Sequence, residues 1–383
     1  MKIAFPRTLN SIGAPMNWVL RLLSAYAAAT ALQAPARAEA MEDCVYLAPA
    51  AAARNSGRRP TEPVTVDTGL ALAAKDRGVR CLLMMPGRYD LTGPLILKSR
   101  NRPLVLSAYR RATVVIDGGG KVGTAISVNG DRLTVRGLTI QNFAQNGIVM
   151  NGSDITIADN IITDVGSSGW SQAAIHGVHF IRRARVINNQ ILRTDYAGIL
   201  FESSKDGELS DIRIESNRVA DVCRKVDDCG AIYGMGRSAR SSGFVVTGNT
   251  IRDYGPKAAM PRAIYLDDFL SDAVVSRNRI SGSGGYAVQI HGGSRNRITG
   301  NSFDIRGASG LLFYQDKGGR PMTGNVVEDN EVILARAQRG REGKFDLRSN
   351  DRIGVERNRF REMQASSVSR AGLVCRRLSC SSC

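Results

Sequence analysis

The stretch Ile157-Ala158-Asp159-Asn160 decides the fold, because its pattern of one apolar residue, two variable residues and an asparagine returns seven more times. The later copies occupy residues 186–189, 214–217, 246–249, 275–278, 298–301, 327–330 and 355–358. Successive asparagines are 29, 28, 32, 29, 23, 29 and 28 residues apart. Repeats of about 20–50 residues are typical of solenoids, in which each unit stacks on the one before.

A second short strand is predicted before most of these motifs, at residues 147–150, 177–180, 198–201, 231–234, 263–266, 287–290 and 310–313. Short β-branched runs alternate with Gly and Ser, which argues against a helical solenoid. We expect each Asn to occupy a sharp turn with left-handed backbone angles and to hydrogen-bond along the stack. The sequence therefore predicts an all-β fold, a right-handed parallel β-helix with about 9–11 coils.

The first 40 residues predict a cleaved export signal. Lys2 and Arg7 precede an apolar run at 22–32, and Ala38-Glu39-Ala40 fits a cleavage site. The run of 11 residues is too short to span a bilayer, and we expect no membrane span in the mature chain. Met16 is an alternative start.

Three regions are predicted after the signal. Residues 41–80 cap the first coil, 81–363 form the β-helix, and 364–383 form a cysteine-containing tail. All seven cysteines lie after residue 40, in local groups that suit disulfides in a periplasmic or secreted protein, although their connectivity stays open.

Residues 80–363 resemble the right-handed β-helix proteins of the pectate-lyase-like superfamily. The segment Cys81-Leu82-Leu83-Met84-Met85-Pro86-Gly87-Arg88-Tyr89 resembles the opening strand of that superfamily, and Asp117-Gly118-Gly119-Gly120 resembles its first turn. The superfamily includes lyases, hydrolases, epimerases and inert adhesins, so the function has to be argued from the site.

The outward residues of the predicted strands suggest such a site. The third strand positions carry Leu200, Tyr233, Tyr265, Gln289 and Leu312, and the positions after the strands carry Glu202, Met235, Asp267, His291 and Tyr314. Coils about 4.8 Å apart make Asp267 and His291 neighbours and place Glu202 about 10 Å from Asp267. Tyrosine rings can bind sugars and carboxylates can transfer protons, so this stripe predicts a carbohydrate site. A polar ladder without chemistry is the alternative interpretation.

Two motifs sharpen this prediction. They are Asp227-Asp228-Cys229-Gly230-Ala231-Ile232-Tyr233 and Ala263-Ile264-Tyr265-Leu266-Asp267-Asp268, and Ile290-His291-Gly292-Gly293 follows one coil later. They resemble segments of exported β-helix glycoside hydrolases, which implies Asp228 and Asp267 as catalytic carboxylates. Hydrolysis requires one carboxyl group as acid and another as base or nucleophile. We rank Asp267, His291 and Asp228 in that order, with Glu202 or Asp268 as partner if Asp228 lies too far away.

The positive net charge of the chain bears on its expected binding partner. The net charge is +17, and loss of residues 1–40 removes four Arg or Lys and one Glu, which leaves +14. A polysaccharide is the expected partner, and the basic charge favours an acidic one. Nucleic acid is not expected, since no nucleic-acid-binding signature is present. Residues expected to bind substrate are Tyr233, Tyr265, Gln289, Arg237, Tyr314 and Lys317.

The first alternative is a lyase or epimerase acting on an acidic polysaccharide, with His291 or Tyr265 as base and Arg237, Lys317 or Arg348 neutralising the uronate. The second is a non-catalytic polysaccharide-binding or surface protein. No cofactor is expected, although calcium would suit the paired aspartates at 227–228 or 267–268. The glycan and the oligomeric state stay open.

Overall fold

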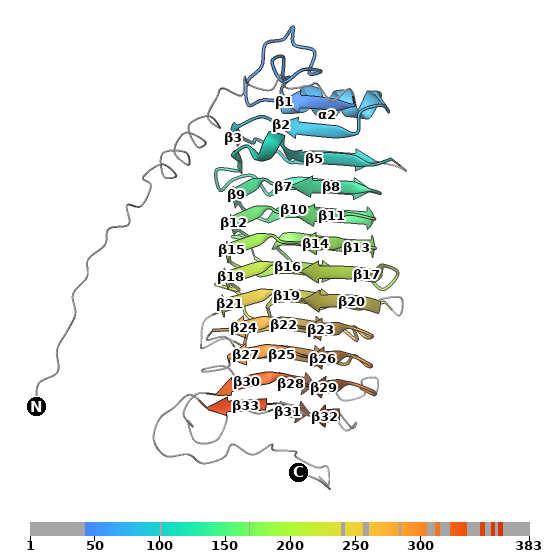
Figure 1. Cartoon of the computed structure of the whole chain (residues 1–383), viewed down its shortest axis with the longest axis vertical. Helices are drawn as coiled ribbons and strands as arrows, with labels where there is room; N and C mark the ends of the chain where they lie inside the picture. The colour runs from blue at the N-terminus through green and yellow to red at the C-terminus, as the bar shows by residue number, and fades with distance from the viewer. Residues whose placement is uncertain are drawn as a thin grey trace, which may run out of the picture. The chain divides into compact units, whose positions relative to one another are not determined.

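The computed structural model describes residues 43–99, 102–167, 169–238, 242–255, 260–282, 285–304, 311–314, 322–334, 345–348, 354–356 and 359–362. Residues 311–314, 334 and those from 345 onward are described by their backbone alone. The predicted export signal, the C-terminal tail, Lys317 and Asn358 lie outside the described residues. Parallel strands wind into stacked coils, which confirms the predicted right-handed β-helix (Figure 1).

Each full coil contributes three strands, one to each face of the solenoid, and the first two faces belong to one continuous sheet. The first face contains β4 (Leu95–Ser99), β7 (Thr124–Gly130), β10 (Asn146–Ser153), β13 (Ala173–Arg182), β16 (Ala197–Glu202), β19 (Gly230–Met235), β22 (Arg262–Asp267), β25 (Tyr286–His291), β28 (Leu311–Tyr314) and β31 (Phe345–Arg348). The second face contains β1 (Cys44–Leu47), β2 (Cys81–Met84), β5 (Leu104–Ala108), β8 (Leu133–Arg136), β11 (Thr156–Ala158), β14 (Arg185–Ile187), β17 (Glu208–Glu215), β20 (Ser242–Thr247), β23 (Val274–Ser276), β26 (Arg297–Thr299), β29 (Val326–Glu328) and β32 (Gly354–Glu356). The third face contains β3 (Gly87–Asp90), β6 (Val114–Asp117), β9 (Thr139–Phe143), β12 (Ile161–Val165), β15 (Gln190–Thr194), β18 (Arg218–Val222), β21 (Thr250–Tyr254), β24 (Arg279–Ser281), β27 (Ser302–Asp304), β30 (Glu331–Leu334) and β33 (Arg359–Glu362).

The first coil is closed by a short helix and a disulfide. Helix α2 (Val66–Lys75) begins after Thr65, whose side chain accepts a hydrogen bond from the Thr68 amide. Strand β1 pairs with β2, and the aligned residues Cys44 and Cys81 form a disulfide. A single 3-10 turn, η1 (Tyr109–Arg111), follows β5. Within the described residues, no helix is long and apolar enough to cross a bilayer.

The repeated asparagines form a buried ladder inside the solenoid. Asn189 donates from Nδ2 to Asn217 Oδ1 at 3.0 Å and to the Ile157 carbonyl at 2.9 Å, and equivalent bonds link the series from Asn160 to Asn330. The expected hydrogen bonding along the stack is therefore confirmed. Because the amides satisfy buried backbone carbonyls, the ladder removes the cost of burying polar groups at each turn.

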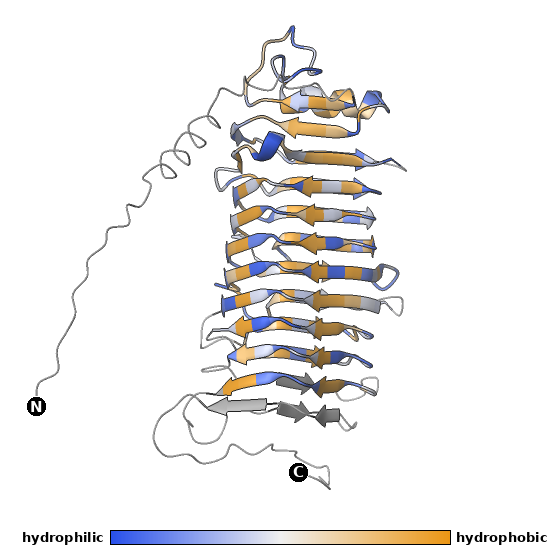
Figure 2. Ribbon diagram, in the orientation of Figure 1, coloured by the Kyte–Doolittle hydropathy of each residue, from blue (hydrophilic) through white to orange (hydrophobic). Residues whose placement is uncertain are grey.

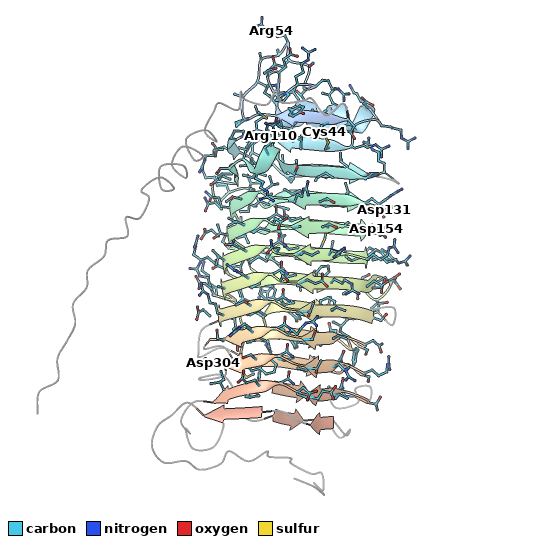
Figure 3. The ribbon with its side chains drawn as sticks, in the orientation of Figure 1. Cys44, Arg54, Arg110, Asp131, Asp154 and Asp304 are labelled. Atoms are coloured by element: carbon cyan, nitrogen blue, oxygen red, sulfur yellow. A yellow bond between two sulfur atoms is a disulfide. The ribbon has the colours of Figure 1, made fainter. Side chains whose placement is uncertain are left out.

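The expected backbone role of these asparagines is wrong. The left-handed residue is the one before each Asn, for example Asp159 and Ser216, both with φ of 57°. Comparable residues mark the other two corners of the coils. Asp154 lies at one of them, where Arg183 of the next coil forms a two-pronged ion pair with it at 2.7 and 2.8 Å. Figure 3 shows Asp131 and Asp154 at the same edge of successive coils.

Along the strands, apolar residues alternate with polar ones, as Figure 2 shows. The inward residues form one continuous apolar core that extends from Val45 to Val332. The alignment of residues 177–180 with the other strands was wrong by three positions. In the structure Ile175 pairs with Ile199 and His176 with Leu200, so the outward third position belongs to His176 and not to His179, the third residue of 177–180.

Candidate carboxylate–histidine site

The site lies on the first face, where four neighbouring coils place their outward side chains in two adjacent columns. One column contains Leu200, Tyr233, Tyr265 and Gln289, which pair in register across β16, β19, β22 and β25. The other column contains Glu202, Met235 and Asp267. This is the register predicted from the sequence.

Asp267 is the centre of the site. Its Oδ1 accepts hydrogen bonds from His291 Nδ1 at 2.6 Å and from the Asp268 amide at 2.8 Å, and its Oδ2 accepts one from the Tyr233 hydroxyl at 2.7 Å. The side chain is only 7% exposed. Burial raises the pKa of Asp267, but the hydrogen bonds from His291 and Tyr233 outweigh it and hold this pKa below its ordinary value. The carboxylate is therefore ionised and can only accept hydrogen bonds, so Nδ1 of His291 bears the proton in this contact. The nitrogen that can take up or release a proton during a reaction is then Nε2.

A second carboxylate–histidine pair lies beside the first. His176 Nε2 lies 3.0 Å from Glu202 Oε1, and the hydrogen bond from His176 lowers the pKa of Glu202 despite its burial. Arg237 joins this pair to the turn after β22, because it lies 3.8 Å from Glu202 and donates to Asp268 at 2.7 Å. The cluster has two net negative charges when both imidazoles are neutral, because it contains one cation, Arg237, and three carboxylates, those of Glu202, Asp267 and Asp268.

Asp228 belongs to the same electrostatic environment. Its carboxylate lies 3.2 Å from Arg262 Nη1, at the end of β22 opposite Asp267. Burial raises the pKa of Asp228 and Asp267 adds to the rise, although Arg262 opposes it. Tyr196 is near the same carboxylates. Its hydroxyl donates to the Asp228 carbonyl at 3.1 Å, and its pKa is raised by burial and then by the charges of Asp228, Glu202 and Asp267. Asp228 and Asp267 thus have pKa values shifted in opposite directions.

The two tyrosines do not offer their faces to a sugar, contrary to the sequence-based expectation. The rings of Tyr233 and Tyr265 stack on each other at 4.6 Å, and the Arg262 guanidinium lies 4.5 Å from the centre of the Tyr265 ring. Both side chains are almost fully buried, as is Gln289, whose amide oxygen accepts a hydrogen bond from Arg262 Nε. Their observed contacts position Asp267 and Arg262.

The comparisons with known proteins agree with this architecture. A family model described as the right handed beta helix region matches residues 121–253 and 176–360, together more than half of the chain. The chain belongs to the right-handed beta-helix family. No curated protein sequence gives a significant match.

Several solved structures share the fold of this β-helix protein. A GH136 lacto-N-biosidase from Eubacterium ramulus has 13% identity over 84% of this chain and 68% of its own, with a TM-score of 0.60. The catalytic unit of a GH87 alpha-1,3-glucanase from Streptomyces thermodiastaticus strain HF3-3 has 15% identity over 78% and 65%, with a TM-score of 0.53. An alginate lyase from Paenibacillus sp. str. FPU-7 has 14% identity over 83% and 98%, with a TM-score of 0.50. Likeness at these identities shows the fold alone.

The turn after β22 contains two left-handed residues in succession. Asp268 and Phe269 have consecutive positive φ values of 47° and 70°. Such left-handed angles are uncommon in residues other than Gly and Asn, and strained backbone gathers at functional sites. Here the strain allows the Asp268 amide to donate to Asp267 and the Asp268 side chain to reach Arg237.

One group of side chains in the β-helix site could hold a metal. Ligand atoms of Asp267, Asp268 and His291 lie within 4.8 Å of one another. A metal would compete with the donors that already occupy both oxygens of Asp267. In the other predicted calcium pair, Asp227 Oδ1 accepts from the amides of Asp228 and Met260, which is a loop-ordering role.

The sequence prediction missed three residues of the site and included two that the structure does not describe fully. The missed residues are His176, Tyr196 and Arg262. His176 had a usable signal, because Ala174-Ile175-His176-Gly177 repeats the pattern of Ala231-Ile232-Tyr233-Gly234. Tyr314 pairs with His291 through the backbone, but its side chain and the whole of Lys317 lie outside the described part of the chain.

Proposed function

We propose that this β-helix protein is an exported, polysaccharide-processing glycoside hydrolase whose centre is the Asp267–His291 pair. The observation that supports it most directly is a buried, ionised aspartate held by Tyr233 and the Asp268 amide directly behind a histidine. A buried carboxylate in this position fixes the tautomer of the imidazole and stabilises the imidazolium that forms when the ring takes a proton.

In the proposed mechanism, His291 is the base and Asp228 is the acid. Nε2 of His291 takes a proton from the attacking water, and Asp267 stabilises the positive charge that results. Asp228, whose pKa is raised by burial, donates a proton to the oxygen of the leaving sugar. Glu202 and Asp268 add negative charge around the positive, oxocarbenium-like transition state.

The local charge favours hydrolysis over elimination. A lyase must neutralise the carboxylate of a uronate to make the neighbouring proton acidic, but both cations described in the site are already paired, Arg237 with Asp268 and Glu202, and Arg262 with Asp228. Two net negative charges repel a uronate at the reacting position. The fold itself permits both reactions, since solved structures that share it include proteins named as glycosidases and as an alginate lyase.

Export is part of the same proposal. It is supported by the signal-like residues 1–40 and by two disulfides in the described chain, Cys44–Cys81 and Cys223–Cys229, because structural disulfides are typical of oxidising compartments. The proposal requires no metal. The carboxylates and histidines supply both proton transfers.

Product analysis tests this function. The purified chain is incubated with neutral and acidic polysaccharides, and new reducing ends are measured together with the ultraviolet absorbance of unsaturated ends. We expect reducing ends without unsaturated ends, and loss of at least about 100-fold in rate for His291→Asn. His179→Asn is the matched control, because His179 contacts Ser204 and lies outside the site. Unsaturated products, or equal activity of the two variants, would contradict the proposal.

A further inference from the structure

A polar cavity lies where the third face turns back toward the first face. It has a volume of about 500 Å³. Among its lining residues are Arg88, Asp117, Arg193, Asp195, Arg224 and Lys225. Arg88 and Arg193 lie on β3 and β15, four strand spacings or about 19 Å apart, so the cavity extends along several coils.

Its acidic groups are recessed and its basic groups are exposed. The side chains of Asp117 and Asp195 are 1% and 10% exposed, whereas those of Arg88, Arg224 and Lys225 are 55%, 40% and 64% exposed. The Asp117 carboxylate accepts hydrogen bonds from the side-chain amides of Gln141 and Asn142 and from the backbone amide of Gly119. A ligand that enters from solvent therefore meets the cations first.

The cations retain hydrogen-bonding capacity. Arg193 uses Nε and Nη2 to bind Asp164, and Arg88 uses Nε and Nη2 to bind Asp90 and Asp117. Both leave an Nη1 group without a hydrogen bond in the described part of the chain. Arg224 makes only long contacts, at 3.8 and 3.9 Å, with its acidic neighbours. Guanidinium groups held in this way are suited to bind carboxylate or sulfate oxygens.

The cavity is connected to the proposed active site by one short loop. Arg224 and Lys225 lie in the segment closed by the Cys223–Cys229 disulfide, and Asp228 lies in the same segment. The loop is anchored to the preceding coil, since the Lys225 amide donates to the Asp195 carbonyl and the Cys223 amide to the Tyr196 carbonyl. Asp195 lines the cavity and its neighbour Tyr196 contacts Asp228, so the two sites are adjacent.

We propose that this cavity binds the anionic group of an acidic polysaccharide, while the Asp267–His291 site receives a neighbouring uncharged sugar. The substrate class is then a heteropolysaccharide in which residues bearing a carboxylate or sulfate accompany neutral ones. This assignment of the substrate rests on the proposed hydrolase function. It explains how a chain with a positive net charge can have a negatively charged reaction centre, because the two regions bind different sugars of one substrate.

Binding measurements on matched variants test the cavity. Fluorescence anisotropy is recorded with labelled oligosaccharides of three kinds, a uronate oligomer, a sulfated glucan and an uncharged glucan, and the integrity of each ligand is checked after the titration. The test variant carries Arg224→Gln and Lys225→Gln. The control variant carries Arg185→Gln and Arg213→Gln on β14 and β17, which removes the same two charges from exposed arginines that are loosely paired with Glu215.

We expect the test variant to lose about tenfold or more in affinity for one or both anionic ligands, and the control variant to lose less than about twofold. The ligand that shows the larger loss identifies carboxylate or sulfate as the preferred group. Equal losses in the two variants, or equal affinity for charged and uncharged ligands, would refute the proposal that this cavity binds an anionic group. A chain that binds through Arg224 and Lys225 but releases no products contradicts only the hydrolase proposal. Thermal unfolding of both variants confirms that they are folded.

Discussion

The substitution Tyr233→Phe isolates one hydrogen bond at the centre of the site. It removes the hydroxyl that donates to Asp267 Oδ2 at 2.7 Å, and it keeps the ring that stacks on Tyr265. A hydrogen bond to a buried charged group is worth about 1.5–3 kcal/mol. Because this hydrogen bond is one of the causes that lower the pKa of Asp267, its loss should raise that pKa.

The sign of the pH effect follows from the direction of this shift. The pKa of Asp267 is depressed in the folded protein, so its stabilising contribution is present above the unfolded pKa and is lost as the pH falls through the folded pKa. Tyr233→Phe weakens the depression. We therefore expect the acidic limb of the activity profile, which reports the coupled Asp267–His291 pair, to move to higher pH, and the unfolding free energy at neutral pH to fall by about 1.5–3 kcal/mol.

The assay is the pH profile of kcat/KM, combined with urea unfolding. Tyr89→Phe is the control, because its buried hydroxyl lies within hydrogen-bond distance of two neutral carbonyl oxygens, those of Leu47 at 2.9 Å and Met85 at 2.8 Å. The control should lose stability without moving the acidic limb. If the limb stays in place in Tyr233→Phe, or moves to lower pH, Asp267 is not the ionised partner of His291 and the mechanism is wrong.

Three further predictions concern the ladder, the loop and metals. Asn249→Ala removes bonds on both sides of a buried ladder position, so unfolding in urea should show a loss of about 3–5 kcal/mol; a loss below about 1 kcal/mol would mean that the ladder is not structural. Replacing Cys223 and Cys229 by Ser should cost about 2 kcal/mol of stability from loop entropy and should lower kcat by loosening Asp228, and unchanged kcat would show that the disulfide does not position this acid. Dialysis against a chelator should leave activity intact because both oxygens of Asp267 already accept hydrogen bonds, whereas loss of activity that added calcium restores would assign the Asp267 cluster to a metal.

The sequence by itself determined the fold and the pairing at the centre of the site. A repeat near 29 residues implies stacked coils, and strand alternation with a period of two places every second residue outside. The contact between Asp267 and His291 follows from those two periods, as does the ladder of buried asparagines. Both are regular features, so local pattern was sufficient to predict them.

The tertiary structure decided how the outward residues are used. Tyr233 and Tyr265 point outward in the pattern, but the ring stack and Arg262 bury them, and contacts between coils cannot be read from one strand. The three-residue error at His176 arose because β13 is longer than its neighbours and contains an irregularity in its pairing with β10. Asp228 joins the site because the loop closed by Cys223–Cys229 is anchored to the preceding coil, and the basic cavity on the other side of that loop had no local sequence pattern. Loop position and side-chain burial depend on residues far apart in the chain, so only the folded arrangement determines them.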